Sequence, residues 1–568
     1  MIKETLSNYS ELVYILKMIV GQSFILTKIS EIKPYSQGIR FGSGGALAVI
    51  KPGTLLEIWK VVEACNEAGT AIIMQAANTG LTGGSTPDGN NYDRPVVIIN
   101  TMRMSQIHLI DSANQVVAFP GSTLFDLEER LAKYGRQTHS VIGSSCIGAS
   151  IIGGVCNNSG GALVQRGPAY TELSLFAHID EARKLSLVNN LGINLGDTTE
   201  EILTNLEQKN YTEEDIKPSK KIASDNEYQQ IVRDINSSRP ARYNNDPRLL
   251  HEASGCAGKL VVFAVRLDTF PKAINERVFY IGTNTPKVMT KIRHDILSTF
   301  KNLPVSGEYF DSQCYDVSKK YGKDIFLVIN KLGSKIIPRL FSFKRYVDRI
   351  ANHFFFLPNK LSDHLMQFLS YLWPNHLPKR MEIFRSHYQL HFILETNNEG
   401  VDEAQAYLNN FFKENEGNFF VCSDEEAKKA TLHRFVIGGA INRYYLTQGS
   451  KSGKMISIDV ALRRDEKNWA QKVPSSVNDK ISEKFSYGHF FCHVLHEIYI
   501  TKKDVNHVST KKQILDFFDS RGAEYPAEHN VGHEYIAKDS LKTFYKECDP
   551  TNTFNPGIGK TSKFRNWS

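Results

Sequence analysis

Two runs rich in glycine and short polar residues constrain the fold of this chain more than any other feature. The first, Gln75–Thr86, directly follows Ala71–Met74, an apolar run that predicts a strand. The second lies within residues 142–167, which hold seven glycines, whereas the whole chain has 39 in 568 residues. Backbone N–H groups in such loops form a concave anion site. One run alone is typical of a flexible connection, but two runs in one region predict a pyrophosphate-bearing cofactor between them.

The common nucleotide-binding motifs are missing from both runs. Neither run contains GxGxxG at the start of a helix, nor GxxxxGK[ST]. Arg40–Gly45 resembles the first of these motifs only weakly. We therefore expect neither a Rossmann NAD site nor a P-loop.

Strands alternate with helices around the first run, which favours an α/β or α+β class for this part of the chain. One helix is expected over residues 1–25, where apolar residues recur at helical spacing. Thr54 is expected to cap a second helix. Residues 190–250 are polar and are expected to form a long surface excursion. Further strands are expected at 46–50, 96–99, 116–119, 259–267, 388–395, 455–462 and 493–500, and further helices at 125–131, 403–412 and 511–521.

The net charge of +7 is confined to residues 331–390, where ten basic residues face three acidic ones. The same window holds eleven aromatic residues. Lysine and arginine are attracted to anionic lipid headgroups, and aromatic side chains enter the bilayer interface beside them. The window therefore predicts contact with a membrane, or else a solvated basic face over an ordinary core. A nucleic-acid site ranks well below both, because no nucleic-acid-binding motif is present.

Composition excludes several other classes of protein. With 41% apolar and 23% charged residues the chain is globular, and no run is long and apolar enough for a membrane-spanning helix. Glu4 and Glu11 lie where a secretion signal needs positive charge and then an apolar core, so we expect no such signal. None of the eight cysteines has CxxC spacing, which fits reduced thiols better than a zinc ribbon.

The glycine loops resemble those of the vanillyl-alcohol-oxidase/p-cresol-methylhydroxylase class of FAD proteins. Six longer segments resemble the bacterial respiratory quinone-dependent D-lactate dehydrogenases over nearly the whole chain. These segments begin at Met74, His139, Ala241, Ser254, Tyr525 and Asp549. The resemblance implies an α+β fold with a two-part FAD-binding domain, an α/β cap domain and a basic, largely helical insert that contacts the membrane.

By this resemblance the cofactor is FAD. The first run contains neither the His nor the Cys that tethers flavin in covalent members, so the FAD is expected to be non-covalent. FAD contacts are expected at Ala76, Ala77, Asn78, Thr79, Gly80, Gly84, Ser85, Gly143, Ser150, Gly160 and Val262.

The implied chemistry is oxidation of D-lactate to pyruvate, with the hydride passing from C2 to flavin N5 and the electrons to membrane quinone. His529, in the run Glu528-His529-Asn530, is the expected general base, because an imidazole titrates near neutral pH. A lone His at a tight turn is more often structural, and the resemblance is what favours catalysis. Arg434 is the expected partner of the substrate carboxylate, with Arg464 as runner-up.

A metal site is a further expectation. His489 and His496 form an H-x6-H pair, and with Glu528 they match the metal ligands of related D-2-hydroxyglutarate and glycolate dehydrogenases. The GDGN segment of those relatives is replaced here by Phe490-Phe-Cys-His-Val-Leu495. Without a metal, the two histidines would be substrate contacts or core residues. His533 is expected to contact and support the site residues rather than the substrate.

The expected division of the chain follows from the resemblance and from the position of His529. An FAD-binding domain is expected at 1–268 and 518–568, a cap domain at 269–310 and 388–517, and a membrane-binding insert at 311–387. The expected partners are D-lactate, quinone and anionic lipids at 331–390, with no nucleic acid, on the cytoplasmic side of the cell inner membrane. One alternative is a soluble FAD dehydrogenase of another D-2-hydroxy acid, such as glycolate or 2-hydroxyglutarate. The other is a non-catalytic membrane or nucleic-acid binder.

Overall fold

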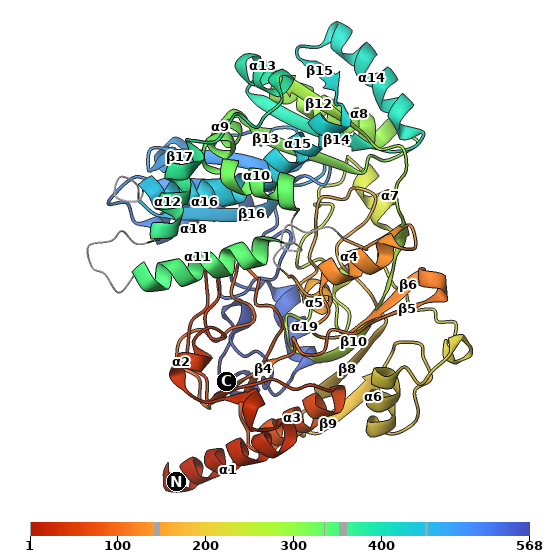
Figure 1. The fold of residues 1–568 in the computed structure, drawn as a ribbon, viewed down its shortest axis with the longest axis vertical. Helices are drawn as coiled ribbons and strands as arrows, with labels where there is room; N and C mark the ends of the chain where they lie inside the picture. Colours follow the sequence, from red (N-terminus) through yellow and green to blue (C-terminus); the bar gives the residue numbers. More distant parts are fainter. Residues whose placement is uncertain (1, 141–147, 334–335, 352–359, 449–452) are drawn as a thin grey trace.

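The structure is a computed structural model that describes residues 2–140, 148–333, 336–351, 360–448 and 453–568 (Figure 1). Two sheets and their helices form most of its lower half. A four-stranded sheet has the order β1-β2-β4-β3 (Ile25–Leu26, Ala48–Ile50, Val96–Asn100, Ala71–Gln75). An antiparallel five-stranded sheet has the order β5-β6-β10-β8-β9 (Ile107–Ile110, Gln115–Ala118, Val261–Asp268, Ser174–Ile179, Leu185–Asn189). A short pair joins β7 (Arg136–Gln137) to β11 (Phe270–Pro271).

The helices of this half are amphipathic and pack their apolar sides onto the sheets. Thr54 caps α3 by accepting a hydrogen bond from the Glu57 N–H, as the sequence predicts. The helices are α1 (Ile2–Val20), α2 (Ile29–Ile32), α3 (Leu55–Glu67), α4 (Leu124–Ala132), α5 (Ile151–Cys156), α6 (Thr199–Gln208) and α19 (Asp539–Cys548). Helix α7 (Tyr228–Arg233) instead packs Tyr228 and Val232 into the core of the upper half.

Two expectations for this half are wrong in part. The helix expected over residues 1–25 ends at Val20, because Gly21 adopts φ 83°, and the chain then turns into β1. The polar stretch 190–250 is more buried than expected. Leu203 and Leu206 of α6 pack into the core against α3, and Arg242 is buried.

A seven-stranded antiparallel sheet forms the upper half of the molecule (Figure 1). Its order is β15-β12-β14-β13-β17-β18-β16 (Asn418–Val421, Arg277–Thr283, Leu390–Thr396, Ser306–Asp311, Ile481–His489, Val494–Thr501, Met455–Ala461). Successive side chains of a strand point to opposite faces, so Phe279 and Tyr280 belong to two different cores. One face packs against α8 (Pro286–Thr299), α14 (Gly400–Glu414) and α18 (His507–Asp519), the last beside α17 (Ser475–Asn478). The other packs against α9 (Ser312–Tyr321), α13 (Lys379–His387), α15 (Asp424–Phe435) and α16 (Ile437–Gln448).

The helices of the expected insert fall into two groups. Tyr315 of α9, Phe326 of α10 (Lys323–Leu332) and Met381 of α13 share one hydrophobic cluster with Tyr280 of the large sheet. Helices α11 (Ile337–Ala351) and α12 (Leu361–Ser370) lie outside that cluster and contact each other. The three-unit division remains a prediction, and this packing ties much of 311–387 to the cap sheet. No helix in the described ranges is long and apolar enough to cross a membrane.

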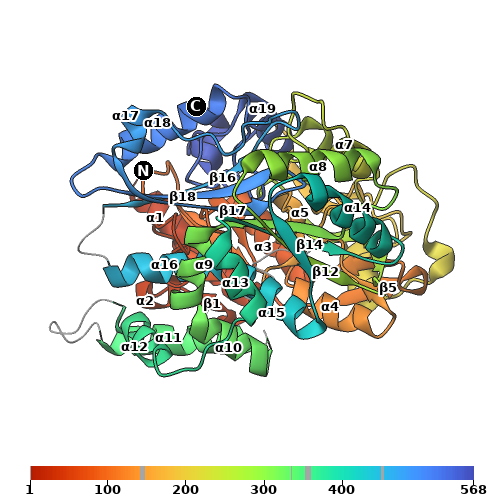
Figure 2. The ribbon, with the colours of Figure 1, turned by 90° about the horizontal axis from the view of Figure 1, so that it is seen from above.

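The C-terminal segment returns from the large sheet to the lower half. Ala461 at the end of β16 exchanges backbone hydrogen bonds with Glu524, and the Ala527 N–H donates to the Asp459 carbonyl at 3.1 Å. Beyond α19, Phe554 forms a bridge with Ile72 of β3. Residues 525–533 therefore lie between the two halves. Figure 2 shows the blue C-terminal part of the chain, with α18 and α19, along the upper edge of the view.

Candidate active site

Four polar side chains stand on one face of the large sheet, on four adjacent strands. Glu308 on β13 pairs in register with His489 on β17, and Asp459 on β16 pairs in register with His496 on β18. Directly opposed residues of an antiparallel sheet point to the same face with their Cβ atoms about 5 Å apart. Tyr487, opposite His496, shares that face. The strand register alone therefore brings these side chains to the same face of the sheet.

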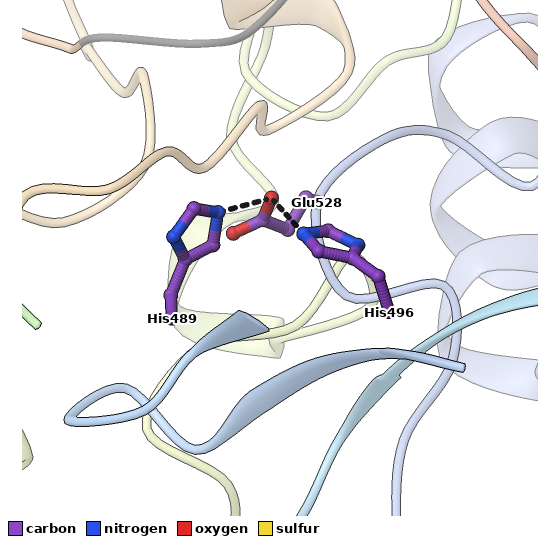
Figure 3. Close-up of side chains that lie close together, drawn as sticks. All are labelled: His489, His496 and Glu528. Atoms are coloured by element: carbon purple, nitrogen blue, oxygen red, sulfur yellow. Dashed lines mark ion pairs between the residues drawn. The ribbon is translucent and has the colours of Figure 1, made fainter. Parts of the chain in front are cut away.

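Glu528 approaches this face from the C-terminal segment (Figure 3). Its Oε2 atom lies 3.3 Å from His489 Nε2 and 3.9 Å from His496 Nε2. One ligand atom of each of these three residues lies within 4.8 Å of the others. The buried Arg242 donates a hydrogen bond to the other oxygen of Glu528 and contacts the Gly161 carbonyl as well. The structure thus brings together the three residues that the sequence predicts as metal ligands.

The electrostatics of this cluster favour charged groups despite their burial. Burial alone raises the pKa of Glu528, but His489 and Arg242 hold it well below its usual range. Burial opposes protonation of His489, yet Glu308 and Glu528 together raise its pKa to about 10. The pKa of Glu308 falls below its usual range in spite of burial, because Arg434 and His489 face it. His489 is thus stabilised in its protonated form by the two carboxylates between which it lies.

Arg434, in the last turn of α15, lies beside this cluster. Its Nη2 atom is 2.8 Å from Glu308 Oε2, and its guanidinium covers the Tyr487 ring at 4.6 Å from the centroid. The buried Nε and Nη2 atoms form no hydrogen bond with the part of the chain that the structure describes. Arg464 is placed elsewhere, because it donates to the Arg239 and Ile231 carbonyls. Of the two arginines, only Arg434 offers donors next to the histidines.

His529 is half-buried on the C-terminal segment next to Glu528. Its Nδ1 atom lies 3.1 Å from the Asn530 carbonyl, and its Nε2 atom lies 3.6 Å from Asp459 Oδ2. The Glu528 N–H donates to the same Asp459 oxygen at 2.9 Å. Asp459 thus contacts both the segment that carries His529 and, through its other oxygen at 3.0 Å, His496 Nδ1.

The glycine loop after β3 has backbone donors that are unpaired among the described residues. None of the backbone N–H groups of residues 77–85 donates to an acceptor in the described ranges. A Cβ atom on Gly80 would meet nothing within 4 Å, so the loop is open there. Unpaired N–H groups around a concave turn suit a pyrophosphate. This observation fits the predicted FAD contacts Ala76, Ala77, Asn78, Thr79, Gly80, Gly84 and Ser85, all of which are half-buried or exposed.

Asn530 links both glycine loops to the C-terminal segment. Its Oδ1 atom accepts a hydrogen bond from Thr82 Oγ1 at 2.9 Å, and its Nδ2 donates to Asn157 in the second loop. His533 lies against the first loop, with Nε2 2.7 Å from the Thr86 carbonyl. The C-terminal segment therefore contacts both regions: Glu528 lies at the sheet cluster, and Asn530 and His533 lie against the glycine loops.

The remaining predicted FAD contacts lie in or near the second loop. Ser150 caps α5 by accepting from the Gly153 N–H, and a Cβ on Gly160 would lie 3.0 Å from Glu528 Oε1. Val262 is buried on β10. Gly143 lies outside the described residues.

Four residues of the site are not anticipated by the sequence analysis: Glu308, Asp459, Arg242 and Asn530. The last two stand inside segments singled out for the resemblance, at 241–244 and 525–533. Asp459 is a lone acid among the apolar residues of β16, which is an unusual position for a carboxylate. That pattern could have marked it as functional.

The comparisons with known proteins identify the family. The quinone-dependent D-lactate dehydrogenase of Escherichia coli (strain K12) is 51% identical over 552 residues, which are 97% of each chain. The chain belongs to the quinone-dependent D-lactate dehydrogenases. The relative from Haemophilus influenzae is also 51% identical, over 97% of this chain and 98% of its own length.

Family models and a solved structure agree with this membership. A model described as "D-lactate dehydrogenase, membrane binding" matches residues 278–567, and a model described as "FAD binding domain" matches residues 46–171. FAD is therefore the cofactor, as the sequence predicts. A crystal structure of p-cresol methylhydroxylase with substrate bound has a TM-score of 0.57 at 12% identity, covering 98% of this chain and 97% of that one. The predicted fold class is confirmed.

Proposed function

We propose that this chain oxidises D-lactate to pyruvate and delivers the electrons to a membrane quinone. One observation carries the proposal. Arg434 lies over the sheet face that carries the two histidines, ion-paired with Glu308 and with a buried Nε that has no hydrogen-bond partner in the described residues. Glu528 joins them from a segment that also contacts the glycine loops. A cation for the carboxylate, polar groups for the hydroxyl and a flavin nearby are what a 2-hydroxy acid needs.

The proposed FAD site uses the loop contacts Ala76, Ala77, Asn78, Thr79, Gly80, Gly84 and Ser85 together with Gly143, Ser150, Gly160 and Val262. The unpaired N–H groups of the first loop support it, because they leave room for a pyrophosphate. The binding is proposed to be non-covalent. When bound, FAD accepts the hydride from C2 of the substrate and passes the electrons on.

The protein's own groups hold the substrate and move one proton. Arg434 binds the carboxylate of D-lactate through its guanidinium fork. His529 takes the hydroxyl proton through Nε2, while Asp459, 3.6 Å away, stabilises the imidazolium that forms. Glu528 holds His489 and His496 in front of the substrate hydroxyl.

His489, His496 and Glu528 are proposed to hold a divalent metal. Both imidazoles turn Nδ1 toward a carboxylate and Nε2 toward Glu528, as in many His-ligated metal sites. Such an ion would polarise the substrate hydroxyl and lower its pKa.

The proposal is tested by anaerobic absorbance spectra before and after addition of D-lactate and, separately, of L-lactate. Bleaching of the flavin band by D-lactate alone is the expected result. A flavin that neither lactate bleaches would refute D-lactate as the substrate. A panel of glycolate and D-2-hydroxyglutarate would then test the alternative dehydrogenase. A purified protein without a flavin band after reconstitution would favour the non-catalytic alternative.

Replacing Gly84 with alanine is expected to weaken FAD binding. The new Cβ would lie 2.3 Å from Asn530 Nδ2, and that amide is held by Thr82 and Asn157. Overpacking of this kind costs about 1–3 kcal/mol, which corresponds to roughly 5–150-fold weaker binding. Fluorimetric titration of the apoprotein with FAD measures the change. Gly439→Ala, whose Cβ would meet nothing within 4 Å, is the control; equal affinities of the two variants would contradict the proposed contact.

The membrane-binding family model supports attachment of the chain to a bilayer. We propose that anionic lipids bind the 331–390 region, on the cytoplasmic side of the cell inner membrane. Exposed apolar side chains on α11, α12 and the following turn support this position: Phe343 is 64%, Phe368 66% and Leu372 74% exposed. Lys331, Lys360 and Lys379 are also exposed. Other basic residues of the region already form ion pairs, namely Lys344 with Asp363, Arg380 with Glu426 and Arg385 with Asp316.

Changing Phe343, Phe368 and Leu372 together to serine is expected to weaken vesicle binding at least about 10-fold. Each side chain loses the gain from entering the interface, up to about 1.5–3 kcal/mol if it is fully buried. Co-sedimentation with vesicles that contain phosphatidylglycerol measures the binding, and dye-linked D-lactate oxidation should remain. Ile274→Ser, at an exposed position between β11 and β12, is the control. Unchanged vesicle binding of the triple variant would show that α11 and α12 are not the contact.

A further inference from the structure

Two carboxylates on the outer strands of the site each face one histidine. Glu308 Oε1 forms a 2.6 Å hydrogen bond with His489 Nδ1, and Asp459 Oδ1 lies 3.0 Å from His496 Nδ1. Both pairs are direct cross-strand neighbours, on β13 and β17 and on β16 and β18. The two pairs flank Glu528 from opposite sides.

This arrangement favours a hydrogen on Nδ1 of each ring. A carboxylate accepts hydrogen bonds and donates none, so His489 Nδ1 must hold the hydrogen that it donates to Glu308. The Asp459 carboxylate, 3.0 Å from His496 Nδ1, favours the same tautomer of His496. Both Nε2 atoms face Glu528, at 3.3 and 3.9 Å, so each would offer its lone pair to a cation that replaced the second proton of His489. A neutral imidazole held in this tautomer is ready to ligate a cation through Nε2.

The second oxygen of each carboxylate faces a different functional group. Glu308 Oε2 lies 2.8 Å from Arg434 Nη2. Asp459 Oδ2 accepts the Glu528 N–H and lies 3.6 Å from His529 Nε2. Each carboxylate therefore connects one histidine of the cluster to one group proposed to handle the substrate.

We infer that Glu308 and Asp459 are a pair of positioning residues for this site. Glu308 orients His489 and holds Arg434 in place for the substrate carboxylate. Asp459 orients His496 and holds His529 for the substrate hydroxyl. The inference deepens the proposed function and depends on it for the roles of Arg434 and His529, whereas the tautomers follow from the carboxylates alone.

An amide in place of either carboxylate cannot accept hydrogen bonds from both donors that face it. In Glu308→Gln the amide oxygen can accept from His489 or from Arg434, but the NH₂ group must then face the other donor. In Asp459→Asn the same conflict arises between His496 and the segment that carries His529. Both variants keep the size of the side chain and lose the matched pair of acceptors.

The test compares the FAD-loaded wild type with Glu308→Gln, Asp459→Asn and the control Glu395→Gln. Glu395 is a carboxylate on neighbouring β14 that accepts from Ser306. The first measurement is the affinity for Zn²⁺ by competition with a chromogenic chelator. Loss of a supporting carboxylate is expected to weaken it about 10–100-fold in the two site variants and to leave it unchanged in the control.

The second measurement is the split between KM and kcat for D-lactate. Glu308→Gln is expected to raise KM mainly, because Arg434 is displaced, and Asp459→Asn to lower kcat mainly, because His529 is displaced. Glu308→Asp and Asp459→Glu, which keep the charge, serve if an amide variant fails to bind FAD. They should restore part of the Zn²⁺ affinity.

The outcomes separate this inference from the proposed function. Wild-type affinity for Zn²⁺ in both variants, together with an unchanged KM and kcat, overturns the pair. If D-lactate does not bleach the flavin band of the wild type, the proposed function fails. The Zn²⁺ affinities alone then test whether Glu308 and Asp459 position the histidines. If the wild type binds no Zn²⁺, the proposed metal site fails. The kinetics then test the positioning roles: a higher KM in Glu308→Gln and a lower kcat in Asp459→Asn support them. The same kinetic change in both variants contradicts them.

Discussion

Replacement of His529 by alanine is expected to slow flavin reduction by D-lactate about 10²–10⁴-fold, with FAD still bound at the wild-type level. The hydroxyl proton must leave as C2 loses its hydride, and His529 is the half-buried imidazole beside Glu528 that is proposed to accept it. FAD should stay because the neighbouring Asn530 and His533, which hold the cofactor loop, are unchanged.

Anaerobic stopped-flow absorbance at the flavin band measures this rate. His507→Ala, an exposed histidine at the start of α18, is the control for loss of an imidazole. Flavin content before mixing shows whether the cofactor site is intact. A reduction rate within a few-fold of the wild type would remove His529 from the role of base and turn attention to His496.

Much of the secondary structure and part of the site follow from local patterns in the sequence. The strand at 71–75 and the glycine loop after it are visible because a buried strand is apolar and a cofactor loop needs small residues. The pair His489 and His496 is visible because six intervening residues are enough for a hairpin, which places both rings on one face.

The partners of those histidines cannot be found in the same way. Glu308 and His489 are 181 positions apart, and they meet only because β13 lies next to β17 in the large sheet. Arg242 reaches Glu528 across 286 positions, from a polar stretch that the sequence places on the surface. Such pairings depend on strand order and register, which local periodicity does not contain.

The insert shows a similar limit. Its basic and aromatic composition predicts contact with a bilayer, but it does not say which side chains face outward. Lys344 and Arg380 are already paired with Asp363 and Glu426, so the composition overstates the free positive charge. Packing also joins α9, α10 and α13 to the cap core, because their apolar stripes cover the face of the large sheet.

Replacement of Arg434 by glutamine is expected to lower kcat/KM for D-lactate about 10²–10³-fold, mainly through KM. Truncating one partner of a buried charge pair costs about 2–5 kcal/mol, part of it because the other charge loses its partner. Here Arg434 is proposed to bind the substrate carboxylate, and Glu308 lies 2.8 Å from its Nη2. Arg434→Lys should recover only part of the loss, since an ammonium keeps the charge but not the planar fork.

Steady-state kinetics over a wide range of D-lactate concentration separates the two parameters, and flavin perturbation spectra with a non-oxidisable carboxylate such as oxalate report binding directly. Arg277→Gln, at an exposed ion pair with Asp424, is the matched control. If KM and oxalate binding stay at wild-type values while kcat falls, Arg434 does not hold the carboxylate. Its place beside Glu308 would then serve the histidine cluster alone, and the cation for the substrate would have to come from another element of the cap.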